Sequence, residues 1–411
     1  MTDKFNPLTE NKLGCAYKWS WSTIKLNHGT SSSCHRTDTD QIDPDTLDNF
    51  HNMPGQIAAR KLMQQGEWPG HGCEYCKNIE KSGGISDRQQ ANSKAEGKRL
   101  PPELLLNNKA VHVSPTIVEV NFSNLCNMSC IYCTSEYSSV WEQEEKLYGI
   151  TGIKPNKFVG KEYQQMVDKF FDWLSNNVES LAELHVLGGE PMIMPELDRM
   201  IDFLGSHVNP DLEFAVVTNL KIPVLKFAST TKKLEALVKS NALKSVKIIA
   251  SLDCWGPQQE YIRTGLSLRH WEVNFSHMVH NNPLLNIAVH SSITGLSIKT
   301  MAELISKIEY YNQFRSNCDI QHSKNFVVDR SCLAPGIFPS GFFDDDFEKI
   351  FAEITNDYTL QEMQGYKLAI DDAPYNPALI DELRDFMSSL DSMRNTNWQQ
   401  LFPWLHEFKT Q

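Results

Sequence analysis

Short apolar runs alternate with longer segments of helical period from about residue 115 to residue 335. The short runs are rich in β-branched residues, which favours strands. The longer segments repeat apolar residues at three- and four-residue intervals, which favours amphipathic helices. The strands predicted are 116–122, 183–187, 212–218, 246–252, 285–292 and 325–328. The helices predicted are 161–178, 194–206, 230–240, 270–281 and 301–315.

Regular alternation of strand and helix predicts an α/β fold with a parallel sheet and right-handed crossovers, and a six-unit partial barrel is the expected shape. We expect three regions: 1–110, the barrel core 111–335, and a helical segment 336–411 with helices at 347–360 and 377–390. Residues 89–109 are polar and basic and are interpreted as a linker. Ligands are expected at the carboxyl ends of the strands.

Composition narrows the possible partners of this 411-residue chain. Its formal net charge of -12 argues against nucleic acid, which requires a basic surface, and favours a peptide or small-molecule substrate. No stretch approaches the roughly 20 apolar residues of a membrane span, and the first residues lack the apolar core of a secretory signal. A cytoplasmic location is therefore expected. The ten cysteines are then better interpreted as thiolates or metal ligands than as disulfides.

Three of these cysteines follow the first predicted strand as C-x3-C-x2-C. This cysteine triplet is Cys126, Cys130 and Cys133, with Tyr132 before the third cysteine. Three thiolates on one loop can hold three irons of a four-iron cluster and leave the fourth iron open for a ligand. Zinc is the alternative, although zinc knuckles usually pair two C-x2-C hooks around one ion.

Four further cysteines precede the predicted barrel. These early cysteines are Cys15, Cys34, Cys73 and Cys76, and the last two form a C-x2-C hook. Four thiolates suit either a structural zinc ion or an all-cysteine iron–sulfur cluster, and spacing alone does not choose between them.

The ends of later strands carry small and polar residues. The second strand ends in Gly188-Gly189-Glu190, where glycines allow a ligand to approach the backbone and the carboxylate can accept an ammonium group. The third strand ends in Thr218-Asn219, which also suits an ordinary polar cap. His185 and His290, within strands, are interpreted as core histidines.

The triplet with its tyrosine, followed by these strand ends, resembles radical S-adenosylmethionine (radical SAM) enzymes. The resemblance implies a TIM-like (β/α)6 partial barrel, a 4Fe-4S cluster on the triplet and SAM on its open iron. It also implies a set of SAM-binding residues: Tyr132, Gly188, Gly189, Glu190, Thr218, Asn219, Ser251, Asp253 and Arg263.

The early cysteines, with Trp19 and Gly29 between the first two and Gly-x-Trp-Pro before the hook, resemble the SPASM or twitch extension of peptide-modifying radical SAM enzymes. That extension usually follows the barrel, whereas here it precedes it. The resemblance implies a second, auxiliary 4Fe-4S cluster in place of zinc.

Cys254, Cys318 and Cys332 belong to neither set, and isolated cysteines are commonly small buried hydrophobes. Cys332 lies just beyond the sixth strand and resembles the hydrogen-donor cysteine of radical SAM epimerases that act on proteusin-type peptides. This implies L- to D-epimerisation of a precursor peptide with a leader, and an electron donor such as flavodoxin or ferredoxin. Cys254 is the second candidate donor. Peptide crosslinking and a sulfur- or cluster-delivering maturase remain the alternatives.

Overall fold

The computed structural model describes residues 14–70, 72–81, 85–94, 110–149, 156–327 and 330–409. One nine-stranded sheet organises these residues, in the order β3-β2-β1-β4-β5-β6-β7-β8-β9. Neighbours from β4 to β9 pair in parallel and in chain order, which confirms the predicted strand–helix alternation. These strands are β4 (Ile117–Asn121), β5 (Glu183–Leu187), β6 (Asn209–Thr218), β7 (Leu243–Ser251), β8 (Asn286–Ile293) and β9 (Gln321–Phe326).

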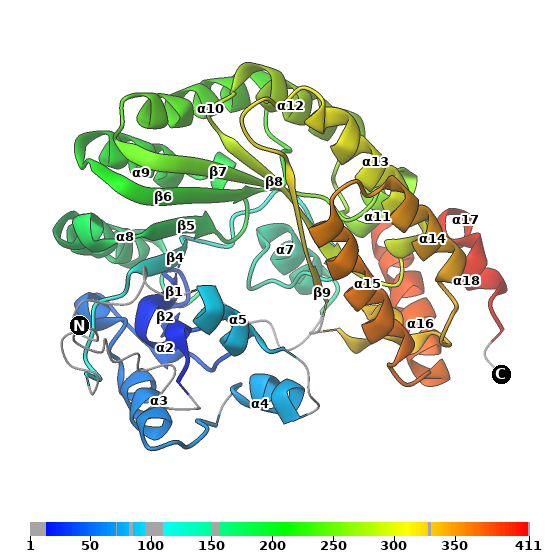
Figure 1. The fold of residues 1–411 in the computed structure, drawn as a ribbon, viewed down its shortest axis with the longest axis horizontal. Coiled ribbons are helices and arrows are strands. Elements are labelled where there is room, and N and C mark those ends of the chain that lie inside the picture. Colours follow the sequence, from blue (N-terminus) through cyan, green and yellow to red (C-terminus); the bar gives the residue numbers. More distant parts are fainter. Residues whose placement is uncertain are drawn as a thin grey trace.

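Five long helices follow the outer side of this curved sheet (Figure 1). Their first residues lie within two positions of the predicted ones, except that α10 begins six residues earlier. The helices are α8 (Gly160–Asn177), α9 (Pro195–Ser206), α10 (Val224–Lys239), α12 (Leu268–Asn281) and α13 (Met301–Asn312).

The N-terminal region extends the same sheet, which the sequence did not predict. β1 (Trp21–Lys25) pairs in parallel with β4, and β2 (Thr30–Ser32) and β3 (Asp40–Gln41) add antiparallel strands. The short strands carry many polar residues, so their apolar pattern is weak. The helices here are α2 (Ala16–Ser20), α3 (Pro54–Gln64), α4 (Glu74–Lys81) and α5 (Asp87–Lys94). The predicted linker is therefore wrong for residues 89–94, which α5 includes, and its remainder lies outside the described residues.

Helices gather at the β9 end of the sheet (Figure 1). The predicted single helix 347–360 is wrong, because the chain turns and Asn356 caps a new helix by accepting a hydrogen bond from the Thr359 amide at 3.1 Å. The helices are α14 (Asp344–Glu353), α15 (Asp357–Asp371), α16 (Pro377–Arg394), α17 (Trp398–Leu401) and α18 (Pro403–Glu407). Between strands lie α7 (Ser139–Leu147) and α11 (Pro257–Ile262). The 3-10 helices are η1 (Leu47–Asn49), η2 (Val178–Ser180), η3 (Pro191–Ile193), η4 (Ile298–Thr300), η5 (Ser331–Leu333) and η6 (Pro335–Ile337).

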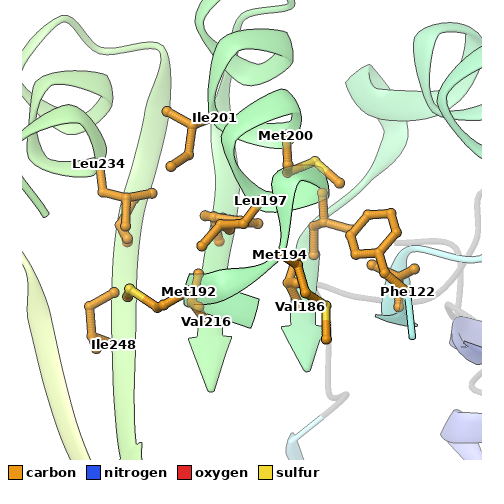
Figure 2. Close-up of a cluster of buried hydrophobic side chains, with 14 of the residues drawn as sticks. Phe122, Val186, Met192, Met194, Leu197, Met200, Ile201, Val216, Leu234 and Ile248 are labelled. Carbon is orange, nitrogen blue, oxygen red and sulfur yellow. The ribbon is translucent and has the colours of Figure 1, made fainter. Parts of the chain in front are cut away.

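The two faces of the sheet differ sharply in chemistry. On the outer face, Val186, Val216 and Ile248 pack with Leu197 and Ile201 of α9 in a buried core (Figure 2). Fully burying each such side chain stabilises the fold by about 1.5–3 kcal/mol. Side chains alternate between faces along a strand. The alternate positions, here called the inner face, are largely polar and charged: Thr23, Lys25, Glu119, Asn121, Glu183, His185, Glu213, Lys247, Ser251 and His290.

A polar inner face is unusual, because parallel sheets are normally apolar on both sides. This face is therefore suited to contact a polar ligand, and the carboxyl ends of its strands position the candidate site. Among the described residues, no helix combines the length and the apolar character needed to cross a membrane.

Candidate functional site

The cysteine triplet lies on the loop that follows β4, and the end of α11 holds this loop by its backbone. Ser129 and Ile131 donate amide hydrogen bonds to the carbonyl groups of Thr264 and Ile262, at 3.0 and 2.9 Å. Inside the loop, the Cys133 amide donates to the Cys130 carbonyl oxygen at 2.9 Å. Hydrogen bonds within the chain thus fix the backbone between the cysteines.

The glycine pair after β5, Gly188 and Gly189, brings the end of this strand against the triplet loop. The Gly189 amide donates to the Ser123 carbonyl oxygen at 3.2 Å, and the Glu190 amide donates to the Leu125 carbonyl oxygen at 2.8 Å. A Cβ atom on Gly189 would collide with that Leu125 carbonyl. The sequence suggested that the glycines admit a ligand, whereas Gly189 makes room for the cysteine loop itself. A contact of this segment with SAM remains a prediction.

The fully buried carboxylate of Glu190 joins the segment that follows β5 to the end of β6. Its oxygens accept hydrogen bonds from the Thr218 hydroxyl at 2.7 Å, the Met192 amide at 3.0 Å and the Asn219 amide at 2.6 Å. Burial raises the pKa of Glu190 to about 7, and these hydrogen bonds only partly oppose it. The structure therefore brings Glu190, Thr218 and Asn219 together, as a support for the loop.

Asn219 extends this support to Asn127, one of the three residues between Cys126 and Cys130. Its side-chain amide donates to Asn127 Oδ1 at 2.9 Å. Asn127 in turn donates to the Lys221 carbonyl oxygen at 2.7 Å, and Lys221 Nζ donates to the Asn127 carbonyl oxygen at 2.8 Å. Asn127 and Lys221 were not predicted as site residues, because nothing in their spacing distinguishes them.

A buried ion pair stands beside the second cysteine. Arg263 binds Asp253 with two hydrogen bonds of 2.8 and 2.9 Å, and the Tyr132 hydroxyl donates to the same carboxylate at 2.9 Å. The remaining guanidinium nitrogen lies 4.0 Å from Cys130 Sγ. Burial opposes its charge, but Asp253 outweighs burial and holds the pKa of Arg263 well above its usual value. The structure thus brings Tyr132, Asp253 and Arg263 together.

Ser251 occupies the last position of β7, in register with His290 of β8, and both side chains belong to the inner face. His290 is half-buried and bonds Ser323 of β9 at 2.9 Å. His185 is also half-buried on this face, where it bonds Glu183 at 2.9 Å. Both histidines have hydrogen-bond partners, but the expectation that they lie in the apolar core is wrong.

Side chains of α7 and of the C-terminal helix α16 also hold the triplet loop. The indole of Trp141 in α7 donates to the Cys130 carbonyl oxygen at 2.6 Å, and the Arg394 guanidinium lies 4.6 Å from that ring. Arg394 also pairs with Glu144 at 2.7 Å, and Glu144 accepts a hydrogen bond from Ser129 at 3.1 Å. No sequence pattern predicts this contact, because Arg394 lies 250 residues beyond Glu144.

The triplet thiols are partly buried and free. Burial raises the pKa of Cys126 to about 12 and also raises that of Cys130 and Cys133, while Arg263 acts in the opposite direction on the last two. Binding of a metal centre must therefore release thiol protons, and the adjacent guanidinium favours the resulting negative charge.

The early cysteines come together from separate elements. Cys15 precedes α2, Cys34 follows β2, Cys73 precedes α4 and Cys76 lies within it, yet all four line one small cavity. A Cβ atom on Gly72 (φ +92°) would collide with the Arg36 carbonyl, so this glycine lets the two cysteine-bearing loops meet. The predicted grouping of these four cysteines is thus present.

A buried lysine shares the cavity with these thiols. Lys18 is 4 % exposed and lines the cavity beside Cys15, Cys34 and Cys73. Burial raises the pKa of Cys15 to about 11 and of Cys34 to about 12, whereas the Lys18 ammonium favours both thiolates. A buried positive charge fits an anionic metal–thiolate group here.

Among the described residues, no three His, Cys, Asp or Glu side chains are placed to share a single metal ion. A four-iron cluster does not require such closeness, because each thiolate binds a different iron.

The two candidate donor thiols are buried. Cys332, in η5, is 1 % exposed, and burial with the nearby Glu382 carboxylate raises its pKa to about 11. Cys254 is fully buried, and its sulfur lies 3.4 Å from the side-chain oxygen of Gln259. Both belong to the apolar cluster shared with the C-terminal helices, and the donor assignment remains a prediction.

Comparison with known proteins identifies no relative by sequence. No protein-family model matches the chain, and no curated protein matches it. Among solved structures, SAM-bound SuiB of Streptococcus suis is similar with a TM-score of 0.39 and 12% identity, covering 91% of this chain and 68% of SuiB. TYW1 with a lysine–pyruvate adduct has a TM-score of 0.27 and 15% identity, covering 46% of this chain and 58% of TYW1. At these TM-scores the likeness establishes neither a shared fold nor a shared activity.

Proposed function

We propose that this protein is a radical SAM enzyme that modifies a peptide, with a 4Fe-4S cluster on Cys126, Cys130 and Cys133. The observation that carries the proposal is the triplet loop itself: three thiols outside any disulfide, on a backbone held by the segment after β5 and by the end of α11, with Asn219 after β6 bonding a side chain of the loop. When bound, a reduced cluster of this kind supplies the electron that cleaves SAM to methionine and a 5'-deoxyadenosyl radical.

The residues around the triplet fit a bound 4Fe-4S cluster with SAM beside it. Asn121 at the end of β4 is 4 % exposed, and its side-chain oxygen has no hydrogen-bond partner among the described residues. An unpaired buried acceptor is costly, so a ligand that donates a hydrogen bond suits this position. On the other side, Arg263 next to Cys130 suits an anionic group. The SAM-binding roles of Gly188, Gly189, Glu190, Ser251 and Asp253 belong to the same proposal.

Anaerobic reconstitution tests the core of this proposal. Wild-type protein should bind iron and sulfide at both cysteine groups, and should release methionine and 5'-deoxyadenosine from SAM when reduced. Replacing the triplet by alanine should abolish SAM cleavage, whereas replacing the early cysteines should remove the second cluster and leave cleavage measurable. Cleavage that survives loss of the triplet would overturn the proposal.

For the reaction on the peptide we propose epimerisation. The Cα hydrogen of an L-residue is removed on one face, and the thiol of Cys332 returns a hydrogen atom on the other, which leaves the D-configuration. Hydrogen-atom donation needs the protonated thiol, and a pKa raised to about 11 keeps Cys332 protonated near neutral pH. Because Cys332 is buried, peptide binding must open the η5 segment.

Mass spectrometry in deuterated water separates the possible reactions on a candidate precursor peptide. Epimerisation adds a deuterium to each residue turned over, because a thiol exchanges with solvent. Crosslinking instead removes a pair of hydrogens, and a maturase leaves the peptide mass unchanged. Cys332→Ala should abolish labelled D-residues, whereas Cys254→Ala, which removes the second candidate donor, should leave them. Normal labelling in Cys332→Ala would refute the donor assignment.

A further inference from the structure

Three aromatic rings connect the early cysteine cavity to the inner face of the sheet. Tyr17 of α2 lines the cavity and packs against the cluster that contains Cys15 and Cys73. Its ring centroid lies 5.3 Å from that of Trp21 in β1, and the Trp21 centroid lies 5.4 Å from that of His185 in β5. Both contacts are edge-to-face, so the rings form one continuous path.

This path crosses from one candidate site toward the other. Trp21 is in register with Ile117 of β4, and Ile117 with Glu183 of β5, so the indole reaches across β4 to meet His185. His185 lies three residues before Gly188, at the strand end that supports the triplet loop. Glu183 fixes the far side of the imidazole through a 2.9 Å hydrogen bond.

Hydrogen bonds also fix the indole in place. Trp21 Nε1 donates to the Thr23 hydroxyl at 3.1 Å, and Thr23 donates to Glu119 at 3.2 Å. An oxidised indole becomes acidic at this nitrogen, so the neighbouring hydroxyl and carboxylate would stabilise the charge. Core packing alone does not require a half-buried tryptophan on a polar face with this arrangement.

We propose that Tyr17, Trp21 and His185 form an electron-transfer relay between a cluster on the early cysteines and the inner face of the sheet. The inference rests on the proposed function, because it needs that second cluster. Electron tunnelling weakens steeply with distance, so intermediate rings allow two sites to exchange an electron in short steps. Trp21 is the central step.

The relay would give the second cluster a role in the proposed epimerisation. After the thiol has given its hydrogen atom to the carbon radical, a thiyl radical remains at Cys332, in η5 beyond β9. One electron from a reduced second cluster would travel along the relay to His185 and then, in a last and longer step, across to Cys332. With one proton from solvent it would restore the thiol, and the cluster would be oxidised by one electron. The three side chains end in the state in which they began.

Pulse radiolysis with azide radicals, which oxidise tryptophan and tyrosine but not phenylalanine, tests the relay in the full-length reconstituted and reduced protein. In wild type, a fast phase of tryptophan-radical decay should coincide with oxidation of the second cluster. Freeze-quench EPR distinguishes the two clusters, because SAM alters only the signal of the triplet cluster. Trp21→Phe keeps the packing but cannot be oxidised by the same radical, so the fast phase should be lost. Trp21→Tyr, which is also oxidisable, should restore fast oxidation of the second cluster, now accompanied by decay of a tyrosyl radical.

The matched control is Trp255→Phe, the same change in a tryptophan that contacts Trp271 and lies outside the path. This variant should behave as wild type. An unchanged fast phase in Trp21→Phe would overturn the relay alone. Zinc in place of iron at the early cysteines would overturn the relay together with the second cluster, while the triplet and its SAM chemistry would stand.

Discussion

The two cysteine groups are assembled in opposite ways. The triplet lies within eight residues of one loop, and distant elements come to it: the ends of β5, β6 and β7, then α7 and α16. The early cysteines span 62 positions, and the fold brings the thiols themselves together around one cavity. Each group has its own buried cation, Arg263 at the triplet and Lys18 at the early site.

The cations differ in how they are neutralised. Arg263 is already paired with Asp253, so the triplet region is nearly charge-balanced before any metal centre binds. Lys18 lies beside the early thiols and favours the Cys73 thiolate, so thiolates formed on metal binding would contribute to balancing its charge. A pre-balanced site can keep its shape while a ligand enters and leaves, which suits a catalytic group. A site whose charge balance improves when the metal binds suits a permanent metal centre.

The largest expected effect is the loss of stability when Arg263, the paired cation at the triplet, is removed. Arg263→Ala leaves the Asp253 carboxylate buried and largely uncompensated, which should cost about 3–5 kcal/mol of unfolding free energy. Urea unfolding of the metal-free protein measures this cost. Arg199→Ala, which breaks the exposed pair with Asp168, is the control and should cost about 0–1 kcal/mol. Similar losses in the two variants would contradict the pre-balanced triplet.

The carboxylates near the two groups should respond to pH in opposite directions. In the folded state the pKa of Glu190 is raised from 4.5 to about 7, so the folded protein holds a proton that the unfolded chain has lost. Unfolding free energy should therefore fall by about 3 kcal/mol as pH rises from 4.5 to 7. Glu190→Gln should remove this slope in urea unfolding at a series of pH values.

Glu80, beside the early cysteines, provides the opposite case. Burial opposes its charge, but hydrogen bonds from Arg88 and Ser86 outweigh burial and lower its pKa below 4.5. Its contribution to the unfolding free energy should be present at neutral pH and be lost as pH falls below 4.5. Glu80→Gln should remove this decrease at acid pH. Parallel pH profiles for wild type and both variants would contradict the assigned shifts.

Glycine substitutions can disturb one group at a time. Gly189→Ala forces a Cβ against the Leu125 carbonyl and should destabilise the fold by about 1–3 kcal/mol, with loss of the triplet cluster. Gly72→Ala should instead release only the early cluster, because its collision is with Arg36. Iron content and EPR of each variant check the separation.

Gly205→Ala in α9 controls for the change of residue type. A Cβ there would make an ordinary contact of 3.6 Å with Leu237, so stability should be unchanged or rise by up to about 1 kcal/mol. Loss of both clusters from either site variant would mean that the two groups depend on each other.

Secondary structure and short motifs could be predicted from the sequence, whereas contacts between residues far apart in the chain could not. The strands from β4 to β8 and the triplet follow from periodicity and spacing within short windows. The sixth predicted strand, 325–328, overlaps β9 (Gln321–Phe326) only at 325–326, because β9 begins with the polar residues Gln321-His-Ser-Lys-Asn325, which carry no apolar pattern. β1 carries too few apolar residues to predict, although it extends the same sheet, and nothing in the sequence links Arg394 to Glu144 or Tyr17 to His185 through Trp21. Pairing across many residues depends on tertiary packing, which a single sequence does not display.

The smallest expected effect is that of the Lys18 charge on the midpoint potential of the early cluster. Lys18→Met keeps most of the buried volume of the side chain and removes the ammonium that faces three thiols. Reduction of a cluster adds negative charge, so loss of this cation should lower the midpoint potential of the early cluster by on the order of 60 mV, a tenfold change for one electron. Lys18→Arg should preserve most of the potential, and the triplet cluster should be unaffected in both variants. EPR-monitored redox titration measures all three values, and an equal shift at the triplet would show that the two groups do not have separate cations.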